Sequence, residues 1–184
     1  AVLLRGFFEV DFSIPVKMLI NLYLFQIYLI LCPCYIENFL YLDLNVCERC
    51  QGTETNLDAA IKDVSTVLEA AGYDIQVNKV NIITKELAFE YEFVSSPTIR
   101  INGKDITIEV KESSCKDCGD LCGDDVDCRV WSYEGKDYNE PPKELIVNAI
   151  LKAVYGETLE VKESTKRYQL PNNLNKFFDA LEKK

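Results

Sequence analysis

The sequence predicts an α/β domain with a mixed central sheet flanked by helices, because strand-like and helix-like segments alternate along its middle. An apolar run at 39–44 leads into a helical pattern that ends at Gly72. A strand at 75–83 and a helix at 84–91 follow. Asn-Gly at 102–103 then joins two alternating runs, which is the strongest short-range hairpin signal. This order of strand, helix, strand, helix and hairpin predicts helices packed on a mixed sheet.

The first strand and helix have distinct patterns. Residues 39–44 are apolar on both faces, as expected of a central strand. Thr53, Thr55 and Asn56 are candidate capping residues for the helix that follows. The apolar positions of that helix recur at spacings of three and four residues, and Gly72 ends it. These positions are Leu57, Ala60, Ile61, Val64, Leu68 and Ala71.

The second half of the chain supplies the remaining elements. Residues 98–101 and 106–110 form the arms of the predicted hairpin, and 130–138 reads as a second hairpin. Two prolines open a helix that runs from 143 to 155. We therefore place one domain at 39–156. Residues 157–184 then form a linker and a short amphipathic helix, which either docks on its own domain or makes a homodimer contact.

Composition excludes several classes of function. With 184 residues and 48% apolar residues the chain can bury a full core. A formal net charge of −10, a pI near 4.6 and the absence of a basic stripe argue against a nucleic-acid partner. The chain contains 0 histidines, which excludes Cys/His zinc fingers, histidine triads and histidine general bases. The chemistry must therefore be done by sulfur or carboxylate.

The N-terminal extension, 1–38, contains an uncharged apolar stretch at 18–36 that Lys17 and Glu37 bracket. As a helix this stretch would be roughly 28 Å long, just enough to cross a bilayer. It therefore predicts either a membrane tether or an added strand or helix of a cytoplasmic domain. Pro33 and the β-branched residues argue against the membrane anchor, and an extension outside the folding unit is a further alternative.

The predicted redox motif is the Cys-x-x-Cys sequence of Cys47, Glu48, Arg49 and Cys50, placed where the first strand gives way to the helix. Two cysteines at this spacing lie on one face of a helix start and can close a small disulfide ring. The unpaired amides of the helix start stabilise a thiolate there, and Arg49 adds positive charge. Half of a metal site and a structural disulfide are the alternatives.

A second cysteine cluster occupies the predicted loop 111–128. Cys115, Cys118, Cys122 and Cys128 supply four thiols over fourteen residues. Four thiolates at this spacing can surround a zinc ion or hold an iron–sulfur cluster. Disulfides, a thiol relay to the Cys-x-x-Cys pair and reduced cysteines without a function remain alternatives.

Part of the sequence resembles thioredoxin. The resemblance covers roughly residues 39–155 and combines the Cys-x-x-Cys motif with features of thioredoxin's second half. More narrowly, the chain resembles an uncharacterised bacterial family of thioredoxin-like proteins that adds a second four-cysteine cluster. The matching residues are Glu86-Leu87-Ala88, Tyr91, Val94, Ser96-Pro97-Thr98 and Asn102-Gly103.

The resemblance implies a thioredoxin-like three-layer sandwich with a cysteine-rich insertion. It also implies that Pro97 is cis and lies beside the Cys47 sulfur, where it and Ser96 expose backbone to an extended substrate. Cys47, nearer solvent, would be the attacking thiolate, and Cys50 would resolve the mixed disulfide. A trans Pro97 that starts an edge strand is the alternative.

Three functions follow from these patterns. The first is a thiol–disulfide oxidoreductase that needs no cofactor at Cys47 and Cys50 and acts on protein or small-molecule thiols and disulfides. The second is a carrier or sensor that binds zinc, copper or arsenite through the thiols of 115–128, with or without Cys47 and Cys50. The third is an interaction module without catalysis, in which the Cys47 sulfur is buried and inert.

Overall fold

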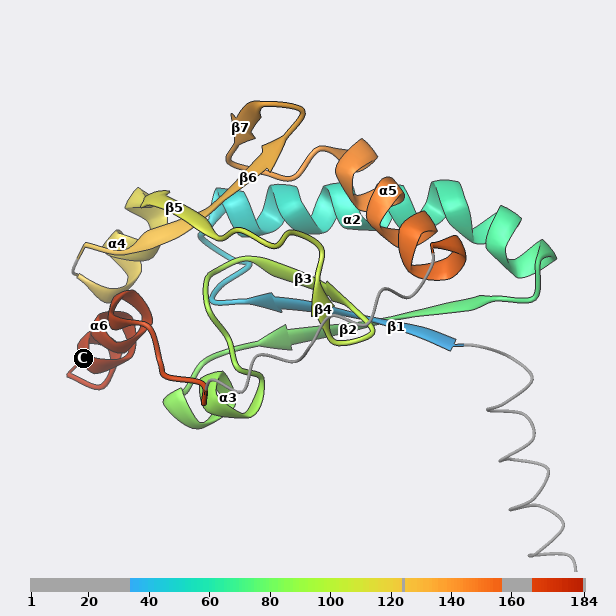
Figure 1. The fold of residues 1–184 in the computed structure, drawn as a ribbon. Helices are drawn as coiled ribbons and strands as arrows, with labels where there is room; N and C mark the ends of the chain where they lie inside the picture. Colours follow the sequence, from blue (N-terminus) through green and yellow to red (C-terminus); the bar gives the residue numbers. More distant parts are fainter. Residues whose placement is uncertain (1–33, 124, 157–166, 184) are drawn as a thin grey trace, which may run out of the picture. The chain divides into compact units, whose positions relative to one another are not determined.

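A mixed four-stranded sheet lies at the centre of the computed structural model, which describes residues 34–123, 125–156 and 167–183 (Figure 1). The strand order is β2-β1-β3-β4. β1 (Cys34–Tyr41) pairs in parallel with β2 (Asp74–Asn81) and antiparallel with β3 (Thr98–Ile101). β4 (Lys104–Asp105) adds a short antiparallel edge. The predicted mixed α/β sheet is therefore confirmed.

Helices cover both faces of this sheet, because successive side chains of β1 point to opposite sides. Phe39 packs with residues of α2 (Glu48–Ala70) and α5 (Lys143–Tyr155). Its neighbour Leu40 packs with Ala88 of α3 (Lys85–Glu90) and with α6 (Asn172–Leu181). In Figure 1, α2 and α5 lie above the sheet, α3 lies below it, and α6 lies to its left.

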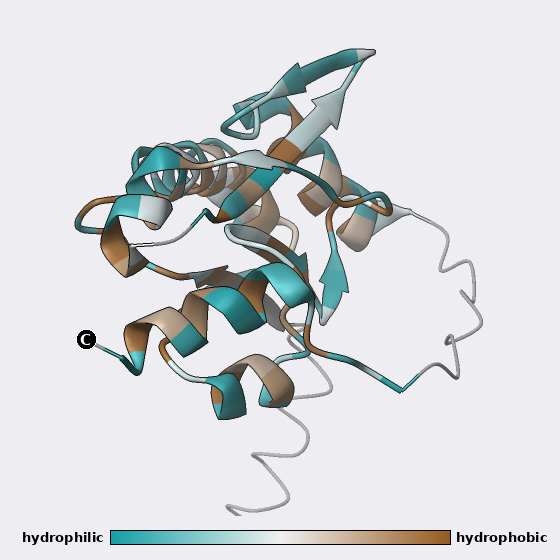
Figure 2. Ribbon diagram, turned by 90° about the vertical axis from the view of Figure 1, so that its left-hand side faces the viewer, coloured by the Kyte–Doolittle hydropathy of each residue, from teal (hydrophilic) through white to brown (hydrophobic). Residues whose placement is uncertain are grey.

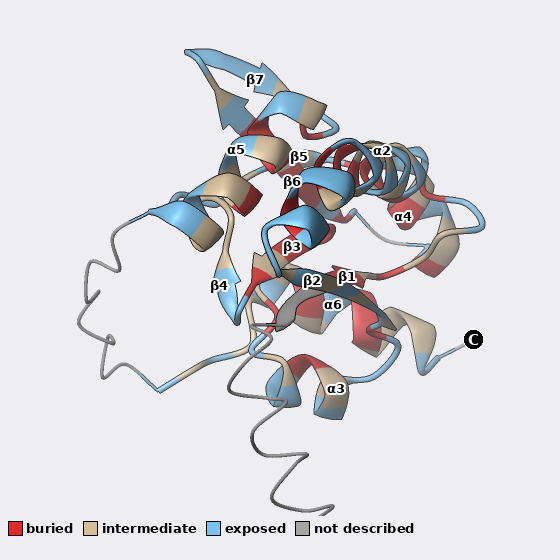
Figure 3. Cartoon of the chain, turned by 90° about the vertical axis from the view of Figure 1, so that its right-hand side faces the viewer, coloured by how far each residue is buried: buried red, intermediate tan, exposed pale blue. Residues whose placement is uncertain are grey.

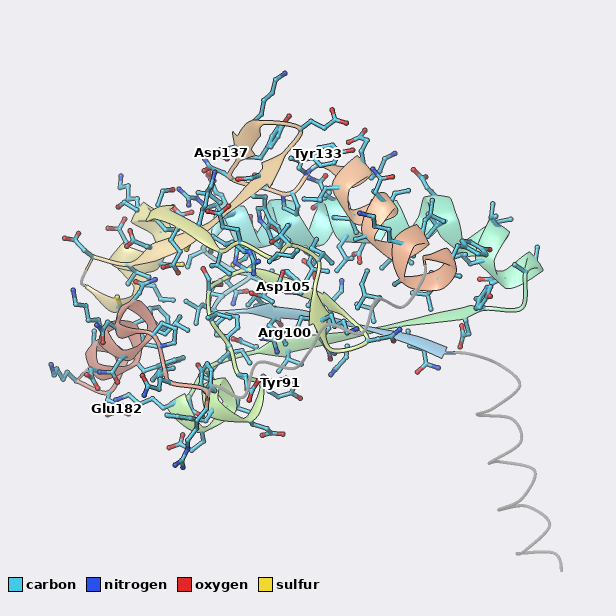
Figure 4. All side chains as sticks on the ribbon, in the orientation of Figure 1. Tyr91, Arg100, Asp105, Tyr133, Asp137 and Glu182 are labelled. Carbon is cyan, nitrogen blue, oxygen red and sulfur yellow. The ribbon has the colours of Figure 1, made fainter. Side chains whose placement is uncertain are left out.

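A second, three-stranded sheet has the order β5-β6-β7. Its antiparallel strands are β5 (Lys111–Ser114), β6 (Asp127–Tyr133) and β7 (Lys136–Tyr138), and α4 (Lys116–Cys122) connects β5 to β6. The two labelled residues Tyr133 and Asp137 mark the β6–β7 hairpin in Figure 4.

Arg129 joins the second sheet to the first. Its backbone amide donates to the Ser96 carbonyl at 2.7 Å, and its side chain donates to both carboxylate oxygens of Asp105 at 2.8 Å. The Arg129 guanidinium also stacks over the Trp131 ring, 4.5 Å from the centroid. A bidentate ion pair between the fully buried Arg129 and the partly exposed Asp105 thus anchors β6 to the edge of the central sheet, where Figure 4 labels Asp105.

Two predicted boundaries are wrong. α2 begins at Glu48, with Cys47 as its N-cap, so the candidate caps Thr53, Thr55 and Asn56 lie inside the helix. β4 ends at Asp105, and residues 106–110 form no strand. The Asp105 carboxylate accepts the Thr107 amide at 3.0 Å, a local turn that takes the chain out of the ladder.

The prediction that residues 111–128 form a loop is also wrong, since this segment contains β5, α4 and the start of β6. Gly119 lies within α4, and Gly123 caps that helix with a φ of 80°. By contrast, the 130–138 hairpin and the helix at 143–155 are confirmed.

The N-terminal predictions fall mostly outside the described residues. Residues 34–38, assigned above to the extension, are part of β1, whereas 1–33 and the predicted linker at 157–166 are not described. Over the described ranges, no helix has both the length and the apolar character needed to span a membrane.

Two buried clusters fill the domain, and they differ in composition. We name the first the apolar core and the second, which contains six cysteines, the cysteine core. Figure 3 shows buried residues along the sheet and α2, whereas β7 is exposed. The apolar core consists of Phe39, Leu57, Ala60, Val64, Leu68, Ile99, Ile101, Trp131, Leu145, Ile146 and Ile150. The cysteine core consists of Leu40, Leu42, Cys47, Cys50, Ile82, Ala88, Phe93, Cys115, Cys118, Cys122, Val126, Cys128, Leu174, Phe177 and Phe178.

Candidate metal centre

Four cysteine sulfurs converge where the first turn of α2 meets α4 and β6. All four Sγ atoms lie within 4.8 Å of one another, and each residue is at most 4% exposed. The Sγ atoms of Cys118 and Cys128 are 3.3 Å apart. We name this group the cysteine quartet: Cys47, Cys115, Cys118 and Cys128.

The sulfur spacing of the quartet fits a single ion. A zinc–sulfur bond of about 2.3 Å gives a tetrahedron whose sulfurs are about 3.8 Å apart. One pair of Sγ atoms in the quartet is 3.3 Å apart, and no pair is more than 4.8 Å apart. These two distances bracket the tetrahedral value. Four buried cysteines therefore lie close enough to hold a metal ion.

Local structure explains how two helix starts deliver ligands. The Asp43 carboxylate accepts the amides of Asn45 and Val46 at 2.6 and 2.7 Å, a turn that directs the chain from β1 into α2. Cys47 follows as the N-cap of α2. Cys115 holds the same position in α4, and its sulfur accepts a hydrogen bond from the Cys118 amide. Cys47 and Cys115 therefore lie at helix starts, where free amides can stabilise thiolates.

Arg49 ties β5 and β6 to the first turn of α2. Its Nη1 atom donates to the carbonyls of Ser113 at 3.3 Å and Cys128 at 3.2 Å, and its Nη2 atom donates to the carbonyl of Ser114 at 2.9 Å. From the other side, Asp117 accepts the Glu48 amide at 2.9 Å. These bonds hold the segments that carry the four ligands together and place a positive charge beside them.

Hydrogen bonds among the four thiols of the quartet shift their pKa values in opposite directions. Hydrogen bonds from Cys115, Cys118 and Cys128 hold the pKa of Cys47 far below its ordinary value. Donation from Cys118 and Cys128 likewise lowers the pKa of Cys115. The pKa values of Cys118 and Cys128 are raised, chiefly because both donate to Cys115. A cation that replaces these shared protons would meet four converging sulfurs.

The other two cysteines of the predicted sites lie outside the quartet. Cys50 is fully buried, and its pKa is raised because it donates to Cys47 and is desolvated. Cys122 is the last residue of α4, with its Sγ 3.7 Å from the Gly119 carbonyl oxygen. The structure thus puts Cys47 in the place that sequence analysis gave to Cys122, because the start of α4, not its end, faces α2.

The loop around Pro97 is enclosed. The Ser96–Pro97 peptide bond is cis, and both residues are buried. The Ser96 hydroxyl accepts the Leu42 amide at 3.1 Å and lies 3.4 Å from the Cys50 sulfur. Because β6 covers this loop and takes the Ser96 carbonyl, the expectation of exposed backbone there is wrong. Cys47 and Cys50 are both 0% exposed, so neither sulfur reaches the solvent.

The C-terminal helix α6 covers the cysteine core. Leu174, Phe177 and Phe178 are buried in that core, so the apolar face of the helix docks on its own domain. Figure 2 shows the mixed hydrophobic and hydrophilic sides of this helix, which leads to the marked C-terminus. Asn173 fixes its start, because the side chain accepts the Asp127 amide at 3.0 Å and donates to the Asp127 carbonyl at 2.7 Å. Sequence analysis predicted this helix but not its contact with the cysteines.

A comparison with protein families matches residues 36–150 to the domain of unknown function DUF2703. The chain belongs to this family. The DUF2703 match includes the whole cysteine quartet and Cys50 but ends within α5, so it does not reach α6. Searches of the curated proteins and of the solved structures find no match.

Proposed function

We propose that this DUF2703 domain binds one soft metal ion, zinc in the first place, through the cysteine quartet, and acts as a thiolate-based metal carrier or sensor. The observation that carries the proposal is the convergence of four buried Sγ atoms within 4.8 Å from three separate elements. Buried thiolates without a cation would repel one another and lose hydration, and a bound cation offsets both costs.

The donor set favours a single tetrahedral ion over the alternatives. Four thiolates are the ligands of closed zinc sites, and they also suit ferrous iron. In a cubane iron–sulfur cluster each cysteine binds a different iron, with sulfide ions between them, which requires a wider ring of thiolates. Arsenite forms only three bonds to sulfur, which would leave one buried thiol over. All four positions are filled by protein, so the site supplies no open coordination position for hydrolysis.

Metal content tests the proposal directly. Protein purified without chelator and dialysed should retain about one zinc ion per chain by elemental analysis. Cobalt substitution should give the charge-transfer and ligand-field bands of a tetrahedral four-thiolate site. Cys47→Ser and Cys118→Ser should each weaken zinc binding by more than about 100-fold, since losing a ligand costs more than losing an outer-shell contact.

Cys122→Ser is the matched control, because Cys122 is buried in the same core but lies outside the quartet. Its zinc affinity should equal that of the parent. The proposal fails if the reduced parent binds no stoichiometric metal, or if Cys122→Ser loses the ion while Cys47→Ser keeps it.

A thiol–disulfide oxidoreductase is the second candidate. It is supported by the lowered pKa of Cys47 and by the contact that Cys50 makes with it. The burial of both thiols weighs against turnover with a protein substrate, because such a substrate must reach the attacking sulfur. In a dithiol-coupled insulin reduction assay, Cys47→Ser should abolish activity and Cys50→Ser should trap a mixed disulfide. A parent with no activity above the uncatalysed rate would reject this candidate.

A further inference from the structure

We infer that metal occupancy of the quartet and a Cys47–Cys50 disulfide exclude each other, so that a small-molecule disulfide acts as the signal that releases the ion. This inference rests on the proposed function and adds the regulation of the same site. It follows from the position of Cys47, which is both a member of the quartet and the first cysteine of the Cys-x-x-Cys motif.

Cys50 is placed to compete with the metal for Cys47. It lies in the first turn of α2, three residues after Cys47, and its thiol donates a hydrogen bond to the Cys47 sulfur. It is 0% exposed and is not one of the four converging ligands. Metal binding therefore leaves Cys50 as a thiol beside the coordinated Cys47 sulfur, placed to attack that sulfur once Cys47 has formed a mixed disulfide.

The surface approaches the quartet at two points. A hollow of about 610 Å³ is lined by Cys115 with Ser114, Gly119 and Asp120. A second hollow, of about 430 Å³, is lined by Val46, which directly precedes Cys47, together with Asp117, Asp120 and Leu121. Val46 is 45% exposed, so the chain is solvent-exposed at the residue directly before Cys47. Hollows of this size admit a small disulfide more easily than they admit a folded protein substrate.

The exchange balances with the disulfide as the only oxidant. The Cys47 thiolate attacks one sulfur of the small disulfide, so that a mixed disulfide forms and one thiolate leaves. Cys50 then attacks the Cys47 sulfur, the intramolecular bond forms, and the second small thiol leaves with the Cys50 proton. Cys47 and Cys50 lose two electrons, the small disulfide gains them, and the ion is left with three of its four ligands.

Thermodynamic linkage makes the coupling measurable in both directions. A metal that binds only the reduced form shifts the equilibrium between reduced and oxidised chains toward the reduced form. The shift grows with the ratio of the free metal concentration to the Kd. We therefore expect a saturating zinc concentration to raise the ratio of glutathione disulfide to glutathione needed for half-oxidation of Cys47 and Cys50 by more than about 100-fold. Reciprocally, the oxidised chain should bind zinc more than about 100-fold more weakly than the reduced chain.

The experiment titrates the full chain with glutathione buffers at zero and saturating zinc. Disulfides are mapped by mass spectrometry after alkylation, and free zinc is followed with a chromophoric chelator. Cys50→Ser should bind zinc like the reduced parent and release it only at a higher ratio of glutathione disulfide to glutathione than the parent does, because Cys47 can then form only a mixed disulfide. Cys122→Ser, the matched control, should release zinc at the same ratio as the parent.

Two results would overturn the inference while leaving the proposed function intact. One is a mapped Cys47–Cys50 disulfide in a chain whose zinc affinity is unchanged. The other is zinc release with Cys50 still reduced and a disulfide between Cys118 and Cys128, whose sulfurs are 3.3 Å apart. A reduced parent that binds no zinc at all would overturn both proposals together.

Discussion

The apolar core and the cysteine core lie against the same sheet but depend on different physics. The apolar core is made of aliphatic and aromatic side chains, whose burial stabilises the fold at any redox state or metal concentration. The cysteine core contains six cysteines, whose contribution changes sign with their chemistry. A protonated thiol packs as a small hydrophobic group, whereas a buried thiolate destabilises the fold unless a cation or a hydrogen bond compensates for its lost hydration.

Helix α2 belongs to both cores. Its first turn carries Cys47 and Cys50, and its later turns carry the residues that pack against α5. On the proposed function, we therefore expect the cysteine core to respond to metal and oxidants while the apolar core remains folded. Each of the following experiments tests that separation.

Removal of metal should have the largest effect, and it should be local. Structural zinc in small domains contributes about 10 kcal/mol or more to the free energy of folding. Chelation of the zinc-loaded chain should therefore abolish amide-exchange protection in α4 and α6, which contact each other, and preserve it in α5 and the later turns of α2. An equal loss of protection in both cores would contradict the separation.

Breaking the link between the two sheets should have the next largest effect. Asp105→Ala leaves the fully buried guanidinium of Arg129 without its counter-charge, which typically costs about 3–5 kcal/mol. Denaturant unfolding should report this loss. Asp137→Ala is the control, because the Asp137 ion pair with Lys111 is exposed and should change the unfolding midpoint little.

A cavity in the apolar core should destabilise the fold without touching the metal site. Ile146 is fully buried on α5, and Ile146→Ala should lower the free energy of unfolding by about 2–5 kcal/mol. The zinc affinity of the folded protein should remain that of the parent. Ile146→Val should cost only about 0.5–1.5 kcal/mol, and a weakened zinc affinity in either variant would show that the cores are coupled.

The smallest expected effect is a pH-dependent contribution to stability from the ion pair between α3 and α6. Lys85 of α3 donates to Asp179, which lowers the pKa of that carboxyl below its ordinary value. The carboxylate therefore stabilises the folded state above the ordinary pKa of aspartate, about 3.9, and this contribution is lost as the pH falls below it. Asp179→Asn should unfold slightly more easily than the parent at pH 7 and equally at pH 2.

The ion pair of Lys143 with Asp63 offers the matched comparison on the side of the apolar core. Asp63→Asn should produce a similarly small change at pH 7. If chelation enlarges the effect of Asp179→Asn but not that of Asp63→Asn, the fit of α6 on the cysteine core depends on the metal.

Much of the fold could be predicted from local sequence patterns. The spacing of Leu57, Val64 and Leu68 predicted the buried face of α2, and Gly72 marks its end. Local signals were weaker at the start of α2, where no side chain accepts a capping hydrogen bond at Cys47. They failed at 106–110, where an alternating pattern exists but the turn at Asp105 removes the chain from the sheet.

The candidate site could be predicted only in part. Sequence spacing identified both cysteine groups, and three of the four ligands lie in the predicted cluster. Spacing favoured Cys122, which is near in sequence, as the fourth ligand and left Cys47 as an optional addition. Spacing along the chain cannot report which end of α4 faces α2, because that orientation is set by the contacts of Asp117 and Arg49 with distant backbone groups.

The sequence by itself limited the candidate chemistry to sulfur or carboxylate, since the chain has eight cysteines and no histidine. It also determined most of the helices and strands, because hydrophobic periodicity and turn residues act over a few positions. Only the tertiary structure decided which sulfurs meet. The docking of β6 on the Ser96 carbonyl and the Arg49 contacts brings Cys47 to three thiols far along the chain, and such long-range packing has no local period in the sequence.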